Sequence, residues 1–216
     1  MTFISRHDHI QGRKLHYLIG QPSDLPLIAF FHGASKRTQN TEFWSPVFDL
    51  LTQISIPVFI DRYGFGKSQG NCSFTQEIND YTDLLLSVMK EYGKTSIYIV
   101  GRSAGAVYTL NILDMNRLNI AGIGLVAPAS MVKYAEKLRN FHGKICVLWD
   151  QRDPVIGFDN YSVFEENKLT HQLFTIGSDG NKSYKHLDAE GIPASHMPEL
   201  HGPKLFKDFI SNLVSN

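Results

Sequence analysis

Residues 96–113 read SIYIVGRSAGAVYTLNIL, and this stretch decides the fold. A short apolar run passes directly into an apolar segment with helical spacing, and the link between them is the motif Gly101-x-Ser103-x-Gly105. Small residues around Ser103 permit a sharp strand-to-helix turn with strained backbone at the serine. Such a turn lifts the Ser103 hydroxyl above the edge of a sheet and sets it at the positive end of a helix, where developing negative charge is stabilised.

Further apolar runs of similar length lie on both sides of this stretch. They are nearly continuous in hydrophobicity rather than alternating, which is typical of strands covered on both faces. They are residues 27–31, 57–61, 120–127, 144–150 and 171–177. Segments with helical spacing lie between them, as at residues 75–92 and from Pro203 onward. This alternation predicts an α/β protein with a mostly parallel sheet wrapped by helices, and residues 3–19, which turn at Gly12, predict an antiparallel hairpin at its edge.

Composition narrows the class of protein. The 216 residues fit one domain, residues 1–216, without repeat or linker. Lys plus Arg and Asp plus Glu both number 21, which gives no electrostatic reason to expect nucleic acid or an anionic membrane as partner. Cys72 and Cys146 have neither disulfide-framework nor metal-site spacing. No apolar segment is long enough to span a bilayer and no secretory signal pattern opens the sequence, so we expect a cytoplasmic protein. The oligomeric state stays open, a monomer included.

A second backbone donor is predicted after the run at 27–31, where His32-Gly33-Ala34 follows. The N–H of Ala34 and the N–H of Ala104 are expected to face a reacting carbonyl oxygen together and so to form an oxyanion hole. Gly33 lets the main chain come close, and His32 is expected to shape the loop rather than act as a base.

A nucleophilic serine needs a base, and the base needs an orienting carboxylate. The segment WDQRDPVI offers Asp150 and Asp153, of which Asp153 lies farther into the loop and is favoured, while Asp150 is expected to cap the turn. His196, in SHMPE before the last helix, can fold back over the serine; His186 and His201 are the competing histidines.

Residues 61–68, DRYGFGKS, are expected to build a tight turn beside the same edge, anchored by Asp61. Their spacing is not that of a phosphate-binding P-loop, which disfavours nucleotide binding. Tyr63 in this turn, Gly33 and Arg102 are candidates for substrate contact. For Arg102 a structural ion pair is the stronger alternative.

These motifs (HGA, DRYGFGKS, GRSAG, Asp153 and His196) stand in the order of the α/β-hydrolase superfamily, which the chain resembles over essentially its whole length. The resemblance implies an eight-stranded, mostly parallel sheet on which Ser103, Asp153 and His196 converge as a catalytic triad. Only residues 128–143 stand where many relatives insert a helical cap, so the chain resembles the small, capless, esterase-like serine hydrolases. The long polar loop at residues 178–195 is a second departure, and we expect it to form one wall of the site.

The prediction for function is hydrolysis of a small ester, thioester or related acyl compound through an acyl-enzyme, with no metal and no organic cofactor. A serine at the turn argues against the haloalkane and epoxide hydrolases, which the chain resembles but which use Asp there. Two alternatives stay open: a non-catalytic ligand-binding or scaffold protein on this fold, and acyltransferase or cofactor-free peroxidase chemistry on the same three residues.

Overall fold

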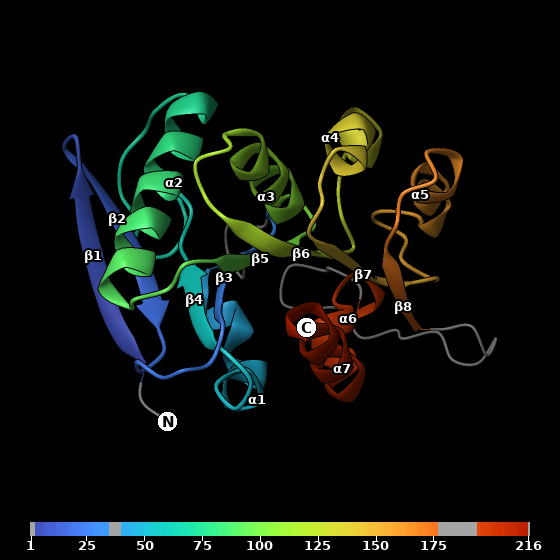
Figure 1. The fold of residues 1–216 in the computed structure, drawn as a ribbon, viewed down its shortest axis with the longest axis horizontal. Helices are drawn as coiled ribbons and strands as arrows, with labels where there is room; N and C mark the ends of the chain where they lie inside the picture. The colour runs from blue at the N-terminus through green and yellow to red at the C-terminus, as the bar shows by residue number, and fades with distance from the viewer. Residues whose placement is uncertain (1–2, 35–39, 177–193, 216) are drawn as a thin grey trace.

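Eight strands form one continuous sheet in the order β1-β2-β4-β3-β5-β6-β7-β8 (Figure 1). The computed structural model of the protein describes residues 3–34, 40–176 and 194–215. The strands are β1 (Ile4–Ile10), β2 (Arg13–Ile19), β3 (Leu27–Phe31), β4 (Ile56–Ile60), β5 (Ile97–Arg102), β6 (Ile120–Val126), β7 (Lys144–Asp150) and β8 (Gln172–Ile176). β2 pairs antiparallel with β1 and with β4, and all other pairs are parallel. The predicted eight-stranded, mostly parallel sheet with a hairpin at its edge is confirmed.

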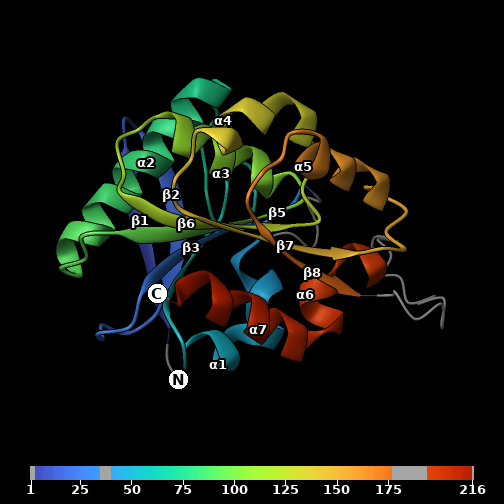
Figure 2. The same ribbon diagram turned by 45° about the vertical axis from the view of Figure 1, so that its right-hand side comes forward.

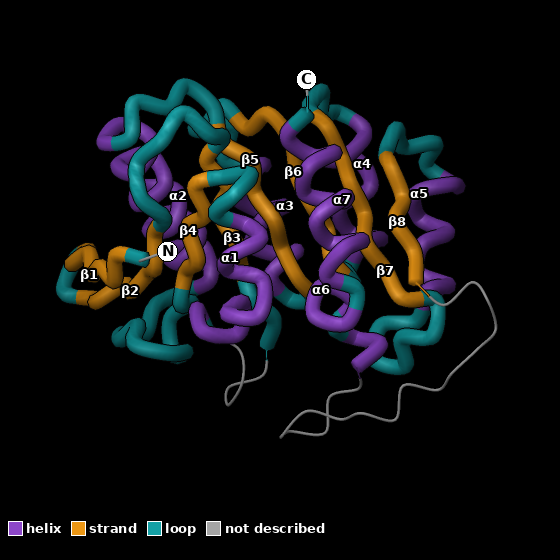
Figure 3. The backbone as a smooth tube through the Cα atoms, turned by 90° about the horizontal axis from the view of Figure 1, so that it is seen from below, coloured by secondary structure: helices purple, strands orange, loops and turns teal. Residues whose placement is uncertain are grey.

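Helices cover both faces of the sheet. One face carries α2 (Phe74–Glu91), α3 (Gly105–Asp114), α4 (Ala135–Arg139) and α5 (Ser162–Glu166) (Figures 1 and 2). The other face carries α1 (Phe48–Leu51), α6 (Pro198–His201) and α7 (Pro203–Val214), which lie in front of the strands in Figure 3. Short 3-10 helices lie at Thr41–Val47, Met131–Tyr134, Phe158–Tyr161 and Ala194–His196. Among the described residues, no helix is both long enough and apolar enough to cross a membrane.

The central strand β3 shows why these runs are apolar at every position. Its side chains alternate between two helix layers, and all of them are buried. Phe31 packs against Tyr81 of α2, with ring centroids 5.5 Å apart. On the opposite face Phe30 packs against Trp44, at 5.3 Å. Both layers therefore need apolar partners from the same strand, and a continuous apolar run satisfies them.

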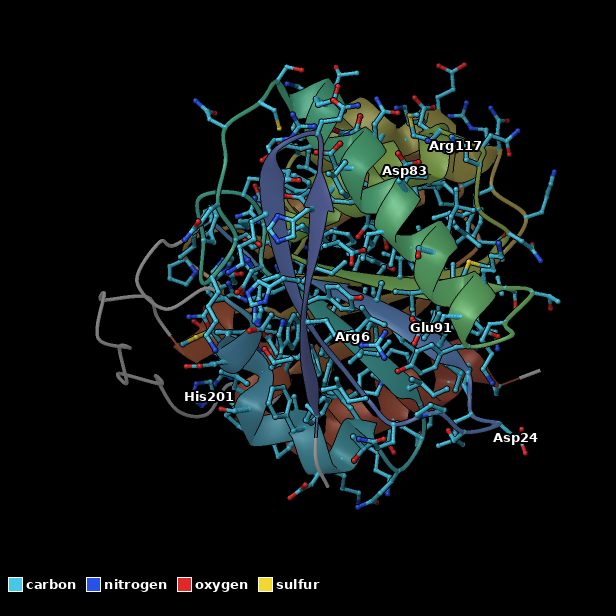
Figure 4. All side chains as sticks on the ribbon, turned by 90° about the vertical axis from the view of Figure 1, so that its left-hand side faces the viewer. Arg6, Asp24, Asp83, Glu91, Arg117 and His201 are labelled. Atoms are coloured by element: carbon cyan, nitrogen blue, oxygen red, sulfur yellow. The ribbon has the colours of Figure 1, made fainter. Side chains whose placement is uncertain are left out.

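The edge hairpin is tied to the nearest helix by ion pairs. Arg6 of β1 contacts Glu91 at the end of α2, with 2.6 Å between Nη1 and Oε2 (Figure 4). Arg13 of β2 contacts Asp80 in the same helix at 2.9 Å. The first pair is largely exposed and stabilises little, whereas the buried Asp80 carboxylate fixes the position of the hairpin more firmly.

The region where relatives insert a cap is short. Residues 128–143 hold only the 3-10 turn Met131–Tyr134 and the short helix α4, so any cap here is small. The loop predicted as a wall of the site, residues 178–195, lies outside the described residues except for Ala194 and Ser195. The single domain over residues 1–216 stays a prediction.

Candidate active site

Ser103 sits at the turn between β5 and α3 in the strained backbone that the sequence predicted, with φ of 51°. A positive φ is costly for a residue with a side chain and persists only where the surroundings hold it. Here the Ser103 N–H donates to Val126 O at 2.8 Å, and the Ser103 carbonyl accepts from the N–H of Ala129 at 3.2 Å. A Cβ on Gly105 would stand 2.1 Å from Phe31 O, so only glycine lets α3 begin this close to β3.

His196 joins the serine to an aspartate. Its Nε2 lies 3.1 Å from Ser103 Oγ and its Nδ1 lies 2.7 Å from Asp153 Oδ2. The other carboxylate oxygen of Asp153 accepts from the N–H groups of Val155 and Ile156 at 2.8 and 3.1 Å, which fixes the carboxylate plane. Because an ionised carboxylate only accepts, Nδ1 carries the imidazole proton and Nε2 is left to accept the serine proton. The arrangement can deprotonate the hydroxyl.

Three other residues are competing candidates for the role of acid or base. Asp150 accepts from Arg152 through both oxygens, at 2.9 Å from Nε and 2.8 Å from Nη2, and it also accepts from the Arg152 N–H at 2.9 Å. It therefore organises the turn after β7, and the structure brings Asp153 rather than Asp150 to the imidazole. His201 is exposed on α6 (Figure 4). His186 lies outside the described residues.

Arg102, a candidate for substrate contact, is buried in an ion pair instead. Only 1% of the residue is exposed; its Nε donates to Glu199 Oε1 at 2.9 Å and its Nη2 donates to His196 O at 2.7 Å. The guanidinium also stacks over the Phe43 ring, 4.9 Å from its centroid. The structure thus supports a structural ion pair for Arg102, the stronger of the two alternatives that its sequence position offered.

Glu199 is a residue of this region that sequence reasoning missed. It is fully buried, and burial raises the pKa of its carboxyl although the Arg102 charge opposes the change. The available signal was a carboxylate three residues after His196 together with an arginine beside Ser103. A buried arginine needs a counter-charge, and Glu199 was the acidic residue beside the histidine.

Ala34 and Ala104 follow two neighbouring strands at equal distance. Phe31 of β3 pairs with Gly101 of β5, and each alanine lies three residues beyond that pair. Ala34 is exposed and Ala104 half-buried, with Ala104 capping the start of α3, where backbone N–H groups have no helical partner. The register therefore places both alanines at the sheet edge that carries Ser103.

The remaining candidates for substrate contact lie in buried surroundings. Gly33 is buried, and its carbonyl accepts from His32 Nδ1 at 2.9 Å and from Arg62 Nη2. Tyr63 is 6% exposed, and its hydroxyl donates to Asp80 Oδ2 at 2.9 Å. This contact directs the Tyr63 hydroxyl toward α2, and its contact with substrate stays a prediction. Among the described residues, no group of three or more His, Cys, Asp or Glu side chains is arranged to hold a metal ion.

The comparisons with known proteins identify the family and the fold of the chain. A family model described as serine aminopeptidase S33 (Hydrolase_4) matches residues 24–171. A predicted CIB-like hydrolase from Thermoplasma acidophilum is 18% identical, with a TM-score of 0.75 over 99% of this chain and 100% of that one. An α/β serine hydrolase homologue from Coxiella burnetii is 16% identical, with a TM-score of 0.74 over 100% and 99% of the two chains.

Naproxen esterase (carboxylesterase NP) from Bacillus subtilis is 15% identical, with a TM-score of 0.73 over 99% of this chain and 92% of that one. No match was found among the curated proteins. At these identities the solved structures establish the fold, and the family model, which covers more than half of the chain, establishes the family. The protein is a member of the serine aminopeptidase S33 family of serine hydrolases, built on the α/β-hydrolase fold.

Proposed function

We propose that this protein hydrolyses a small ester, thioester or related acyl compound through a covalent acyl-enzyme, with Ser103, His196 and Asp153 as its catalytic triad. The observation that carries the proposal is the pair of contacts made by His196, at 3.1 Å to Ser103 Oγ and 2.7 Å to Asp153 Oδ2. The strained backbone of Ser103 at the start of α3 supports it independently. Neighbours in the fold that are named as esterases favour the ester class.

In the proposed first half-reaction, Ser103 Oγ attacks the acyl carbonyl carbon while its proton passes to His196 Nε2. The tetrahedral oxyanion is held by the N–H groups of Ala34 and Ala104. His196 then gives the proton to the leaving group, the bond to that group breaks, and Ser103 is left acylated. Asp153 keeps the proton on Nδ1 and stabilises the imidazolium that forms.

In the second half-reaction, water attacks the acyl-serine while His196 Nε2 takes a proton from it. Collapse of the second tetrahedral intermediate returns that proton to Ser103 Oγ and releases the carboxylic acid. The short segment at residues 128–143 supports a small acyl group, because a multi-helix cap that could enclose a long apolar tail is not present within it.

The test uses p-nitrophenyl esters of increasing acyl length together with a fluorophosphonate probe. We expect the highest kcat/KM for short acyl groups, and a single phosphonate adduct that peptide mass spectrometry maps to Ser103. Product analysis with added alcohols separates hydrolysis from acyl transfer. A folded protein that cleaves no ester and takes up no phosphonate would contradict the proposal and favour a binding or scaffold role.

A further inference from the structure

We infer that Arg62 is a positioning residue for the oxyanion hole: it clamps and polarises the Gly33–Ala34 peptide group, whose N–H faces the acyl oxygen. The inference rests on the proposed function. It concerns an arginine of the DRYGFGKS turn that has no role in the proposed triad. Arg62 donates hydrogen bonds to Gly33 and to His32.

The carbonyl of Gly33 is held by two side chains. Arg62 Nη2 donates to it, and His32 Nδ1 lies 2.9 Å from it. The role of His32 follows from its other nitrogen, because Nε2 lies 3.2 Å from the backbone N–H of Arg62 and must accept. Nδ1 therefore carries the proton and donates to the same carbonyl.

His32 stays neutral in this setting. Burial, and next the Arg62 charge, lower the pKa of His32 to about 3. The positive charge at the Gly33 carbonyl thus comes from Arg62, while His32 contributes a neutral hydrogen bond. A charged donor polarises an amide more strongly than a neutral one, and an amide whose carbonyl is so engaged becomes a better N–H donor.

Because the Gly33–Ala34 peptide group is planar and trans, holding its carbonyl also fixes the direction of its N–H. The C=O of Gly33 and the N–H of Ala34 belong to one peptide group and point in opposite directions. With the carbonyl turned toward Arg62, the N–H is turned away from it. The start of α3 lies directly against the end of β3 there, since a Cβ on Gly105 would meet Phe31 O at 2.1 Å and His32 O at 2.8 Å.

Arg62 is itself held rigidly. Only 4% of the residue is exposed, and its guanidinium lies 4.4 Å from the Phe65 ring centroid and 4.6 Å from that of Tyr108. Its Nε makes no hydrogen bond within the part of the chain that the structure describes. Tyr108 lies on α3, the helix that follows Ser103, so the clamp and the nucleophile share one support. Lysine lacks the planar fork and cannot fill the space between two rings in the same way.

The test compares Arg62→Met and Arg62→Lys with the wild type on a short p-nitrophenyl ester. Rates are referred to active sites titrated with a fluorophosphonate. Removing a whole oxyanion donor costs about 10²–10³ in kcat. Because Arg62→Met only weakens one donor, we expect a loss of roughly 10- to 100-fold in kcat with KM little changed. Arg62→Lys should recover part of that loss.

A phenylboronic acid, which forms a negatively charged tetrahedral adduct on the serine, provides the second measurement. Its affinity should fall by the same factor as kcat/KM in each Arg62 variant, because both report charge at the oxyanion. Arg13→Met, which removes an arginine paired with Asp80 on α2, is the matched control and should leave both quantities unchanged. A purely structural role for Arg62 would reduce the titrated fraction of active enzyme but not the rate per active site.

Unchanged kcat per titrated site in Arg62→Met, or unchanged boronate affinity beside a reduced kcat, would overturn the inference. If Arg62→Met does not fold, Phe65→Leu removes one of the two stacking rings and should give a smaller loss with the same proportionality. A wild type without esterase activity or phosphonate adduct contradicts the proposed function and the inference together, whereas an active wild type with an equally active Arg62→Met contradicts the inference alone.

Discussion

Two serine–histidine–aspartate arrays occur in this molecule with nearly the same hydrogen bonds. The elbow array consists of Ser103, His196 and Asp153, and the hairpin array consists of Ser5, His16 and Asp61. The serine–histidine distance is 3.1 Å in the elbow array and 3.0 Å in the hairpin array. The histidine–aspartate distance is 2.7 Å and 2.6 Å. In both arrays the histidine and the aspartate are buried. Side-chain hydrogen bonds alone therefore do not distinguish a reactive serine from a structural one.

The two serines differ in backbone conformation and in the element that follows them. Ser103 has a positive φ and leads into the N-terminus of α3, where backbone N–H groups can receive negative charge. Ser5 is exposed near the start of strand β1, paired with Leu18, and is not among the described residues with positive φ. A strand places no helix N-terminus beside its serine. Under the proposed function, we therefore expect the strand-to-helix turn, and not the trio of side chains alone, to make Ser103 reactive.

The two aspartates also differ in the backbone N–H groups that donate to them. Asp153 accepts from two N–H groups of its own loop. Asp61 accepts from the N–H of Thr41 at 2.6 Å and from the N–H of Lys67 at 2.8 Å. Together with its contact to His16, these bonds join its own turn to β2 and to the start of the 3-10 helix Thr41–Val47. Burial alone would raise the pKa of Asp61, but its hydrogen bonds with His16, Lys67 and Thr41 outweigh burial and hold the pKa below its ordinary value. Asp61 is thus expected to matter for stability and Asp153 for rate.

The largest expected effect is that of Ser103→Ala. With no oxygen to acylate, turnover of a short p-nitrophenyl ester should fall roughly 10⁴-fold or more, while the variant folds normally. Steady-state kinetics and circular dichroism on matched protein provide the measurement. Near wild-type turnover in Ser103→Ala, with the loss appearing in Ser5→Ala instead, would reverse the assignment of the two arrays.

Asp153→Asn should have the second-largest effect on turnover. An amide at this position permits the wrong imidazole tautomer, and the expected loss in kcat is about 10⁴, as for the equivalent change in a serine protease. Asp150→Asn is the matched control, because its carboxylate pairs with Arg152 in the neighbouring turn, and it should lose far less. If Asp150→Asn loses more than Asp153→Asn, the role of acid belongs to Asp150.

Asp61→Asn should cost stability rather than rate. Weakening a buried carboxylate that accepts three hydrogen bonds should lower the free energy of unfolding by about 1–3 kcal/mol, with kcat per titrated site unchanged. Because the pKa of Asp61 is lowered in the folded state from 3.8, its contribution is present above that value and is lost as the pH falls through the folded pKa.

The difference in Tm between wild type and Asp61→Asn should therefore be largest near neutral pH and become smaller in acid. Thermal unfolding followed from about pH 7 down to about pH 2, below the ordinary carboxyl pKa, measures it. A constant difference over this range would show that the charge of Asp61 does not contribute to stability. A loss of kcat comparable to that of Asp153→Asn would show that the hairpin array takes part in catalysis.

Ser5→Ala is expected to have the smallest effect. It removes one hydrogen bond from an exposed hydroxyl to His16, which should change stability by about 0.5–1 kcal/mol at most. Incubating Ser103→Ala with excess fluorophosphonate sharpens the comparison further, because we expect no adduct on Ser5. An adduct mapped to Ser5 would mean that a hydrogen-bonded trio is sufficient for reactivity without the strand-to-helix turn.

Much of this arrangement could be predicted from local sequence. The motif around Ser103 specifies its turn through glycines, and the chain order of serine, aspartate and histidine predicted which side chains meet it. The hairpin array could not be predicted in the same way. His16 lies beside Asp61 because β2 pairs with β4 in the register that sets Tyr17 opposite Ile60, and a one-residue slip would turn the His16 side chain to the other face.

Arg102 and Tyr63 show a second limit of prediction from sequence. Both were candidates for substrate contact because they stand in motifs at the right sheet edge. Their burial depends on Glu199 and Asp80, partners 97 and 17 residues away along the chain. Motif position predicts which strand end a residue follows, but it does not predict which distant carboxylate a long side chain reaches.

The ion pair between Arg102 and Glu199 has a consequence for how such a chain can change over generations. Arg102 precedes Ser103 and Glu199 follows His196, so the pair links the segments that carry these two residues through buried charge. Loss of either partner alone leaves an uncompensated charge in the interior, at a cost of about 3–5 kcal/mol. Positions 102 and 199 are therefore expected to covary across related sequences, and a variant library that randomises one of them without the other should yield mostly destabilised members.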